Sequence, residues 1–480
     1  MRVTADPVAA RPPSVERLLA AVRPRRPAGQ DHAALVAAAR EVLGEERDRL
    51  VAAGSAGARG LGELADALVA RLDAWAGSRP VPTINATGVI VHTNLGRAPW
   101  ADEAIAAAAA AAGPLLLEID RASGRRGARF RVAEEHLVAL TGAEDALVTN
   151  NNAAALALAV GLAGRGRGVA VSRGELVEIG GGVRIPEIVR RAGVRLIELG
   201  TTNRTRAEDF GEVLAEGSAT VVLRVHPSNF RQAGFVETPD PRAVAELAHR
   251  HGAVVVDDLG SGALLATEAF GLAHEPTPGE RLDDGADLVT FSGDKLVGGP
   301  QAGFIVGRAD LVARIRRDPL ARAMRPDKVT LAAVAATLGI YRAGLARDRI
   351  PVWRMIATPL ESIVARAEAM TAALTDIAER ARASVVLVEA TVGGGSLPGE
   401  TIPSAGLAIE PSGGRPELLL AALRSGTPAV VGRIEDGRAI LDLRTVDPRQ
   451  DASLVDAVGA AVASLPGSTG PRRGRASSRA

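Results

Sequence analysis

The stretch DLVTFSGDKLVGGPQAGFIV, residues 287–306, contains two short apolar runs separated by a glycine-rich turn. The turn carries Lys295, one of only two lysines in a chain of 480 residues with 57 lysines and arginines in total. An amine can lose its proton and attack a carbonyl group, whereas a guanidinium stays charged. A surface lysine that has escaped replacement by arginine is the alternative. The short spacing of the runs predicts two antiparallel strands around a turn with a reactive lysine.

Five further apolar runs precede this stretch, and most of them are separated by segments with helical periodicity. They cover residues 146–149, 168–172, 194–199, 219–225 and 253–258. Short apolar runs that alternate with helices are typical of strands buried on both faces of a parallel sheet. Together with the two runs around Lys295, the pattern predicts an α/β fold with a mostly parallel, seven-stranded sheet.

The segments on both sides of this sheet region have different patterns. Before it, apolar residues recur at helical spacing, as at Val15, Leu18 and Val22, and GSRPVP at 77–82 interrupts the pattern. After it, further apolar runs and helical segments indicate a smaller α/β unit and then an arginine-rich end. The predicted parts are a small helical N-terminal domain at 1–80, a large cofactor-binding domain at 81–345, a small α/β C-terminal domain at 346–466 and a disordered basic tail at 467–480.

The overall composition is that of an ordinary globular protein. Hydrophobic residues make up 47% of the chain, and a formal net charge of +1 gives no overall attraction for nucleic acid. The chain has no cysteine, which excludes disulfides, thiolate nucleophiles and cysteine-based metal sites. No signal peptide or transmembrane span is visible in the sequence, so we expect a cytoplasmic protein.

Polar residues follow several of the predicted strands at the point where each strand ends. NNN occupies 150–152, HPSNF occupies 226–230, and DDLGSG occupies 257–262. Ligands of doubly wound sheets gather beyond the carboxyl ends of the strands. Free amides at a helix start can bind a phosphate, although three asparagines can equally be a plain helix cap.

Together these groups fit pyridoxal phosphate. This cofactor needs a lysine for its imine, a carboxylate facing its pyridine nitrogen, and amides or hydroxyls for its phosphate. We predict Lys295 as the imine lysine and Asp257 as the partner of the ring nitrogen. Asp258 is the alternative, because a one-residue error in the strand end would exchange the two. The predicted cofactor-binding residues are Lys295, Asp257, Asn151, Asn152, Ala153, His226, Asn229 and Ser292.

Several segments resemble the signature sequences of a known family, bacterial selenocysteine synthase or L-seryl-tRNA(Sec) selenium transferase. They are INATGVIVHTNLGRAP (84–99), SRGELVEIGG (172–181), ELGTTNRT (198–205), HPSNF (226–230), DDLGSG (257–262) and FSGDKLVGGPQAG (291–303). The resemblance covers nearly the whole chain. It implies the type I fold of pyridoxal phosphate enzymes and a ring-shaped homodecamer.

The resemblance also implies an activity and further site residues. The family converts seryl-tRNA(Sec) and selenophosphate to selenocysteinyl-tRNA(Sec), with Lys295 in the place of the imine lysine. Arg97, Arg322 and Arg325 resemble the arginines that bind the substrate anion. An arginine-rich segment such as RIRRDPLARAMRPDK is otherwise more often a solvated helix face, and a pocket shared with Arg97 would require a second subunit.

Two other functions remain open from the sequence. One is a related lyase that acts on a small amino acid or amino sugar without tRNA, and the other is an RNA-binding scaffold with a vestigial cofactor site. The presence of both Asp257 and Lys295 counts against the scaffold. The helical domain at 1–80, with basic residues in RPRRP at 23–27, is expected to dock tRNA, and an oligomerisation module is its alternative.

Overall fold

The computed structural model describes residues 12–25, 31–53, 58–76, 80–126 and 131–465. The predicted basic tail at 467–480, Arg26 and part of the predicted boundary at 77–82 lie outside these ranges. The chain separates into two compact units, Met1–Pro82 and Thr83–Ala480. Among the helices in the described ranges, none is both long enough and apolar enough to cross a membrane.

The first unit consists of three helices with a core of their own. They are α1 (Val15–Val22), α2 (His32–Ala53) and α3 (Leu61–Ala76). Ser14 is the N-cap of α1, and its hydroxyl accepts a hydrogen bond from the amide of Arg17 at 3.3 Å. The buried side chains of this core are mainly leucine, alanine and valine at helical spacing, and all of them lie between Leu18 and Leu72.

The second unit is built on a seven-stranded sheet, which confirms the predicted fold class. In spatial order the strands are β2 (Asp145–Thr149), β10 (Gly303–Gly307), β9 (Leu288–Ser292), β8 (Val254–Gly260), β7 (Ala219–Val225), β3 (Gly168–Ser172) and β6 (Arg195–Leu199). β10 pairs antiparallel with both β2 and β9, whereas the pairs from β9 to β6 are all parallel. The predicted antiparallel return after the Lys295 turn is therefore confirmed.

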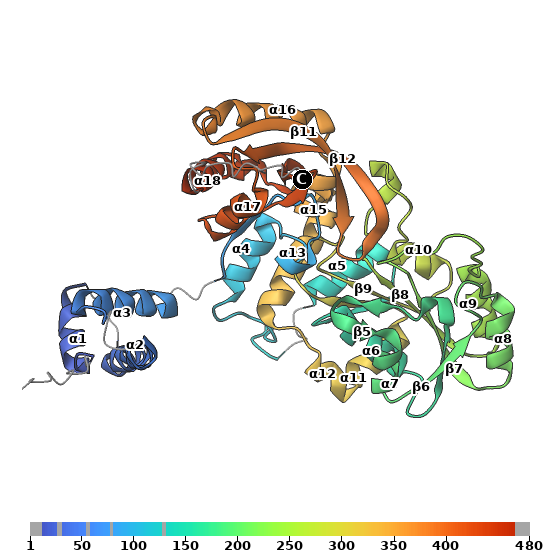
Figure 1. Cartoon of the computed structure of the whole chain (residues 1–480). Helices are drawn as coiled ribbons and strands as arrows, with labels where there is room; N and C mark the ends of the chain where they lie inside the picture. Colours follow the sequence, from blue (N-terminus) through green and yellow to red (C-terminus); the bar gives the residue numbers. More distant parts are fainter. Residues whose placement is uncertain (1–11, 26–30, 54–57, 77–79, 127–130, 466–480) are drawn as a thin grey trace, which may run out of the picture. The chain divides into compact units, whose positions relative to one another are not determined.

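Helices cover both faces of this sheet (Figure 1), so its strands are apolar on both sides. One face packs against α6 (Asn152–Gly161), α7 (Ile185–Arg191) and α11 (Ala309–Arg317). The other face packs against α5 (Val132–Thr141), α8 (Ala207–Ala215), α9 (Pro241–Arg250) and α13 (Lys328–Arg342). The remaining helices of this part are α4 (Asp102–Ala111), α10 (Pro278–Asp283), α12 (Pro319–Ala323), α14 (Ala346–Arg349) and α15 (Pro351–Ala357).

A second sheet, four-stranded and antiparallel, lies in the C-terminal part of the same unit. Its order is β11 (Ala381–Gly393), β12 (Ser396–Pro411), β15 (Arg438–Asp442) and β14 (Arg433–Glu435). Its core includes side chains of α16 (Leu360–Ala373), α17 (Pro416–Ser425) and α18 (Asp451–Ser464). β1 (Thr83–Asn85) pairs with β13 (Ala429–Val431), so the start of this unit also contributes to that core. Residues 350–356, which the sequence assigned to the C-terminal domain, contribute Trp353 and its neighbours to a core of the large sheet, together with α5 and α13.

Candidate active site

A cavity of about 480 Å³ lies beyond the carboxyl ends of β8 and β9. This volume is within the ~300–1,000 Å³ that is usual for small-ligand sites. Eight of the residues predicted from the sequence line it, namely Lys295, Asn151, Asn152, Ala153, His226, Asn229, Ser292 and Arg97. Asp257, Arg322 and Arg325 do not line it. Segments far apart in the sequence therefore meet at the edge of the sheet where ligands of this architecture bind.

Lys295 lies in the turn that follows β9, with its side chain half-buried. Burial lowers the pKa of Lys295, and the nearby carboxylates of Asp258 and Asp294 partly oppose this shift. Among the described residues, its Nζ has no hydrogen-bond or ion-pair partner within contact distance. A partly desolvated, unpaired amine is easier to deprotonate, so the site suits a nucleophilic lysine.

Asp258, not Asp257, faces Lys295, and the reason is the alternation of side chains along a strand. In β8, Val256 packs on the same face as α6, whereas Val255 packs on the opposite face with α8 and α9. Asp258 therefore shares the face of Val256, and it lines the cavity. The prediction that Asp257 faces the cofactor site is wrong for this reason, and the alternative takes its place.

Each of the two aspartates has its own set of partners. Asp258 Oδ1 accepts hydrogen bonds from Asn152 Nδ2 at 2.7 Å and from Thr290 Oγ1 at 2.8 Å. Burial raises the pKa of Asp258, and these two hydrogen bonds oppose the rise. Asp257 lies on the other face with its Oδ2 at 3.6 Å from Arg281 Nε. Asp258 is thus held in one orientation toward the cavity, with its second oxygen directed to no described partner.

The first turn of α6 lies in the wall of the cavity. Asn151 caps this helix, and its Oδ1 accepts a hydrogen bond from the amide of Ala154 at 2.9 Å. The first amides of a helix have no acceptor within the helix, and they carry the positive end of its dipole. Asn152 Oδ1 is buried without a hydrogen-bond partner in the described part of the chain. The helix start therefore fits a phosphate and a further polar group.

A glycine-rich hairpin that the sequence analysis did not include closes the cavity near the lysine. Gly393, Gly394 and Gly395 connect β11 and β12, and all three have positive φ angles of 73°, 62° and 77°. A Cβ atom on Gly395 would lie 3.3 Å from Lys295 Nζ, so glycine keeps space open beside the amine. Three consecutive glycines between two strands were the available signal in the sequence.

His226 and Asn229 follow β7 and are fixed by different contacts. Asn229 Nδ2 donates a hydrogen bond to the carbonyl of Glu178 at 2.7 Å. His226 Nε2 lies 3.4 Å from Oε1 of the buried Glu275. Both side chains line the Lys295 cavity. Ser292, which is buried at the end of β9, lines it as well.

Arg97 is the one member of the predicted anion site that reaches the cavity. It has a left-handed backbone conformation with φ of 68°, and its guanidinium forms an ion pair with Asp294. The amide of Ala98 also donates to the carbonyl of Asp294 at 3.2 Å. Arg97 is thus tied to the residue directly before Lys295.

Arg322 and Arg325 lie elsewhere on the same chain. Both side chains are exposed, on α12 and in the segment that follows it. Arg325 Nη1 lies 3.7 Å from Glu118 Oε1. Within one described chain, these two arginines do not share a pocket with Arg97. A common anion site would therefore need a contribution from another subunit.

The fold and the site define a class, an α/β enzyme with a partly desolvated lysine, a buried carboxylate and a free helix start at one sheet edge. The structure of D-glucosaminate-6-phosphate ammonia-lyase is similar in fold, with a TM-score of 0.57 and 22% identity over 82% of this chain and 98% of that one. The sequence matches the family model for L-seryl-tRNA selenium transferase over residues 83–447. The chain belongs to this family, as the resemblance of its motifs implied.

Relatives named L-seryl-tRNA(Sec) selenium transferase support this membership. The one from Rhizobium meliloti (strain 1021) is 46% identical over 432 residues, which cover 88% of this chain and 92% of the relative. The one from Moorella thermoacetica is 42% identical over 449 residues, which cover 93% of this chain and 95% of the relative. Both alignments extend over most of either sequence, so the chain is a transferase of this family.

Proposed function

We propose that this chain converts L-seryl-tRNA(Sec) to L-selenocysteinyl-tRNA(Sec), with pyridoxal phosphate as cofactor and selenophosphate as selenium donor. The observation that carries the proposal is the placement of Lys295 in one cavity with Asp258 and the start of α6, in a chain of this family. The lyase on a small amino acid or amino sugar, and the scaffold with a vestigial site, have no comparable support.

The residues around the cavity fit the cofactor. Lys295 Nζ would hold it covalently, Asp258 would face its ring nitrogen, and the first amides of α6 would bind its phosphate. When bound, pyridoxal phosphate supplies an electron sink for negative charge at the Cα of the seryl group. The cavity and the glycines at 394–395 leave space for a flat ring beside the amine.

The side chains of the chain supply the proton transfers. Lys295 Nζ would remove the proton from Cα of the seryl group. The lowered pKa of Lys295 favours this role, because a neutral amine is needed as the base. The seryl hydroxyl would leave Cβ as water, selenium would add at Cβ, and the phosphoryl group of the donor would be released as phosphate. Asp258 would hold the proton on the ring nitrogen of the cofactor.

The donor anion, the assembly and the location are further parts of the proposal. Arg97, with Arg322 and Arg325 of another copy, would bind selenophosphate, since bidentate guanidinium groups suit phosphate-like oxygens. This arrangement is in keeping with the homodecamer that the family resemblance implies. The same resemblance supports a cytoplasmic location.

The activity is tested with purified protein, pyridoxal phosphate and seryl-tRNA(Sec). We expect selenocysteinyl-tRNA(Sec) to form when selenophosphate is added, and we expect seryl-tRNA(Ser) to remain unchanged. The product is measured by releasing the amino acid from the tRNA and identifying it by mass spectrometry. Turnover of free serine or of an amino sugar phosphate, with no change in either tRNA, would instead establish the lyase.

Asp258→Asn is expected to slow the reaction more than Asp257→Asn. A hydrogen bond to a charged group contributes roughly 1.5–3 kcal/mol, which corresponds to about 10- to 100-fold in rate. Asp258→Asn should lower kcat by about this factor, whereas Asp257→Asn, on the other face of β8, should mainly lower Tm. Steady-state kinetics and thermal unfolding of both variants check this. The reverse order of the two kcat values would return the role to Asp257.

A further inference from the structure

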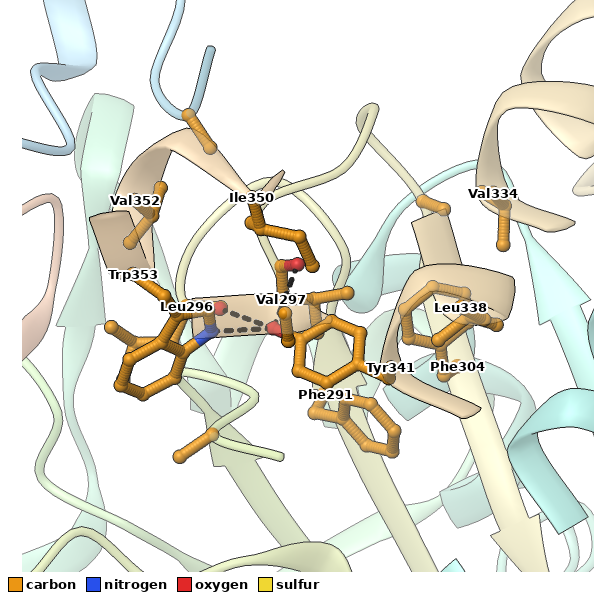
Figure 2. Close-up of a cluster of buried hydrophobic side chains, with 14 of the residues drawn as sticks. Phe291, Leu296, Val297, Phe304, Val334, Leu338, Tyr341, Ile350, Val352 and Trp353 are labelled. Carbon is orange, nitrogen blue, oxygen red and sulfur yellow. Dashed lines mark hydrogen bonds between the residues drawn. The ribbon is translucent and has the colours of Figure 1, made fainter. Parts of the chain in front are cut away.

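The turn that carries Lys295 lies on a cluster of buried side chains from α13, α15 and the segment between them (Figure 2). Tyr341, the only tyrosine of the chain, lies near the end of α13 with its ring buried. Its hydroxyl donates to the carbonyls of Leu296 at 3.1 Å and Val297 at 3.0 Å. These carbonyls belong to the two residues directly after the lysine.

The hydroxyl of Tyr341 is itself held in place. Trp353 Nε1 donates a hydrogen bond to Tyr341 Oη at 2.5 Å, and the Trp353 side chain is fully buried (Figure 2). The Tyr341 hydroxyl thus accepts a hydrogen bond from Trp353 and donates to the carbonyls of the turn. Burial raises the pKa of Tyr341, so the hydroxyl keeps its proton. The Tyr341 hydroxyl therefore remains a hydrogen-bond donor at neutral pH.

The rest of the turn is closely packed against the same helices. The amide of Gly298 donates to the carbonyl of Lys295 at 3.0 Å. A Cβ atom on Gly298 would lie 2.3 Å from Cγ2 of Ile350, at the start of α15. The backbone therefore has no room to shift toward α15, and Tyr341 holds it from a second direction. Since Lys295 Nζ has no partner of its own in the described chain, the backbone of the turn is what anchors the side chain beside the cavity.

We infer that Tyr341, oriented by Trp353, is a positioning residue for Lys295: it fixes the two carbonyls after the lysine and so directs Nζ into the cavity. This inference rests on the proposed role of Lys295. The alternative is that the hydroxyl only satisfies buried carbonyls and stabilises the core. If Tyr341 is a positioning residue, loss of its hydroxyl alters the turn and Lys295. If its role is only structural, loss of the hydroxyl lowers stability alone.

Tyr341→Phe removes the hydroxyl and leaves the ring. We expect amide hydrogen exchange at residues 296–299, measured on the full chain without cofactor, to become faster on the order of tenfold. With cofactor, the fraction of Lys295 that is covalently modified after borohydride reduction should fall at limiting pyridoxal phosphate. In steady-state kinetics kcat should fall, while KM for seryl-tRNA(Sec) stays unchanged. Trp353→Phe keeps the Tyr341 hydroxyl but removes the indole N–H that donates to it. This variant should give a smaller change in the same direction.

Thr141→Val is the matched control. Its hydroxyl is also buried, and it donates to the carbonyl of Leu137 at 2.8 Å within α5, outside the cavity. This variant should lower Tm without changing exchange at 296–299 or the modification of Lys295. If Tyr341→Phe behaves like Thr141→Val in these measurements, or if exchange rises while kcat and lysine modification stay unchanged, the inference is overturned. Exchange measured without cofactor does not depend on the reaction, so a failure of the proposed activity would be recognised separately.

Discussion

Lys295→Ala is expected to abolish both covalent attachment of pyridoxal phosphate and formation of selenocysteinyl-tRNA(Sec). The amine has two roles in the proposal, as the group that holds the cofactor and as the base at Cα. Loss of a positioned acid–base group alone costs up to about 10⁴-fold in rate, so we expect turnover to fall by at least this factor. Borohydride reduction with peptide mass spectrometry measures the attachment, and the tRNA assay measures the turnover.

Lys328→Ala is the control, because Lys328 is the other lysine of the chain. It lies at the start of α13, where Nζ donates to the carbonyls of Ala112 and Gly113, and it does not line the cavity. We expect this variant to keep cofactor attachment and turnover. Attachment that persists without Lys295 and disappears without Lys328 would contradict the assignment.

The sheet was predictable because most of its strands are buried on both faces and therefore appear in the sequence as short apolar runs. The predicted strand at 219–225 coincides with β7, and the one at 168–172 coincides with β3. The position of the lysine followed from the same pattern, since the turn after a central strand lies at the ligand edge. The local sequence pattern therefore predicted both the sheet and the position of the reactive lysine.

The choice between Asp257 and Asp258 required information that local composition does not contain. Both follow a run of valines that is apolar on both faces, so the run does not show which side chains point toward α6. The partners that decide it, Asn152 and Thr290, come from other segments.

Contacts between distant segments account for the other differences. Gly395 is 100 residues after Lys295 and reaches it only because β11 and β12 form a hairpin. Arg322 and Arg325 match a family motif, yet Arg322 on α12 and Arg325 after it do not line the cavity that Arg97 lines. The role of Tyr341 could not be predicted from the sequence, because a single tyrosine in a buried helix does not differ in pattern from an aromatic residue of the core. Its role depends on which carbonyls its hydroxyl reaches.

The described helices of the N-terminal unit form a core of their own. Its buried side chains all belong to α1, α2 and α3, and none of them is part of the cores that begin at Ile84. Glu46 is buried in it and bonds Arg49 and Arg59, which lowers the pKa of Glu46 to about 2. The unit thus has internal apolar and ionic contacts of its own, as a separate module should.

Deleting residues 1–75 is expected to leave cofactor attachment at Lys295 intact while binding of tRNA(Sec) is lost. A tRNA body extends far from the aminoacyl end, so a module outside the cofactor-binding fold can recognise it by shape and backbone. Residues 1–80 hold 12 arginines against 10 acidic residues, so recognition would depend on local phosphate contacts rather than on net charge. We expect affinity to fall by at least about 10³-fold, the usual gap between specific and non-specific binding.

Filter binding of labelled tRNA(Sec) at fixed salt, with tRNA(Ser) as reference, measures this loss, and reduction with borohydride checks that Lys295 still takes up the cofactor. Lys295 and the residues that line the cavity all belong to the second unit. A shortened protein that retains the cofactor but discriminates tRNA(Sec) from tRNA(Ser) as well as the full chain would place recognition in the second unit. In that case α1–α3 would serve assembly or packing, and the docking role of residues 1–80 would be refuted.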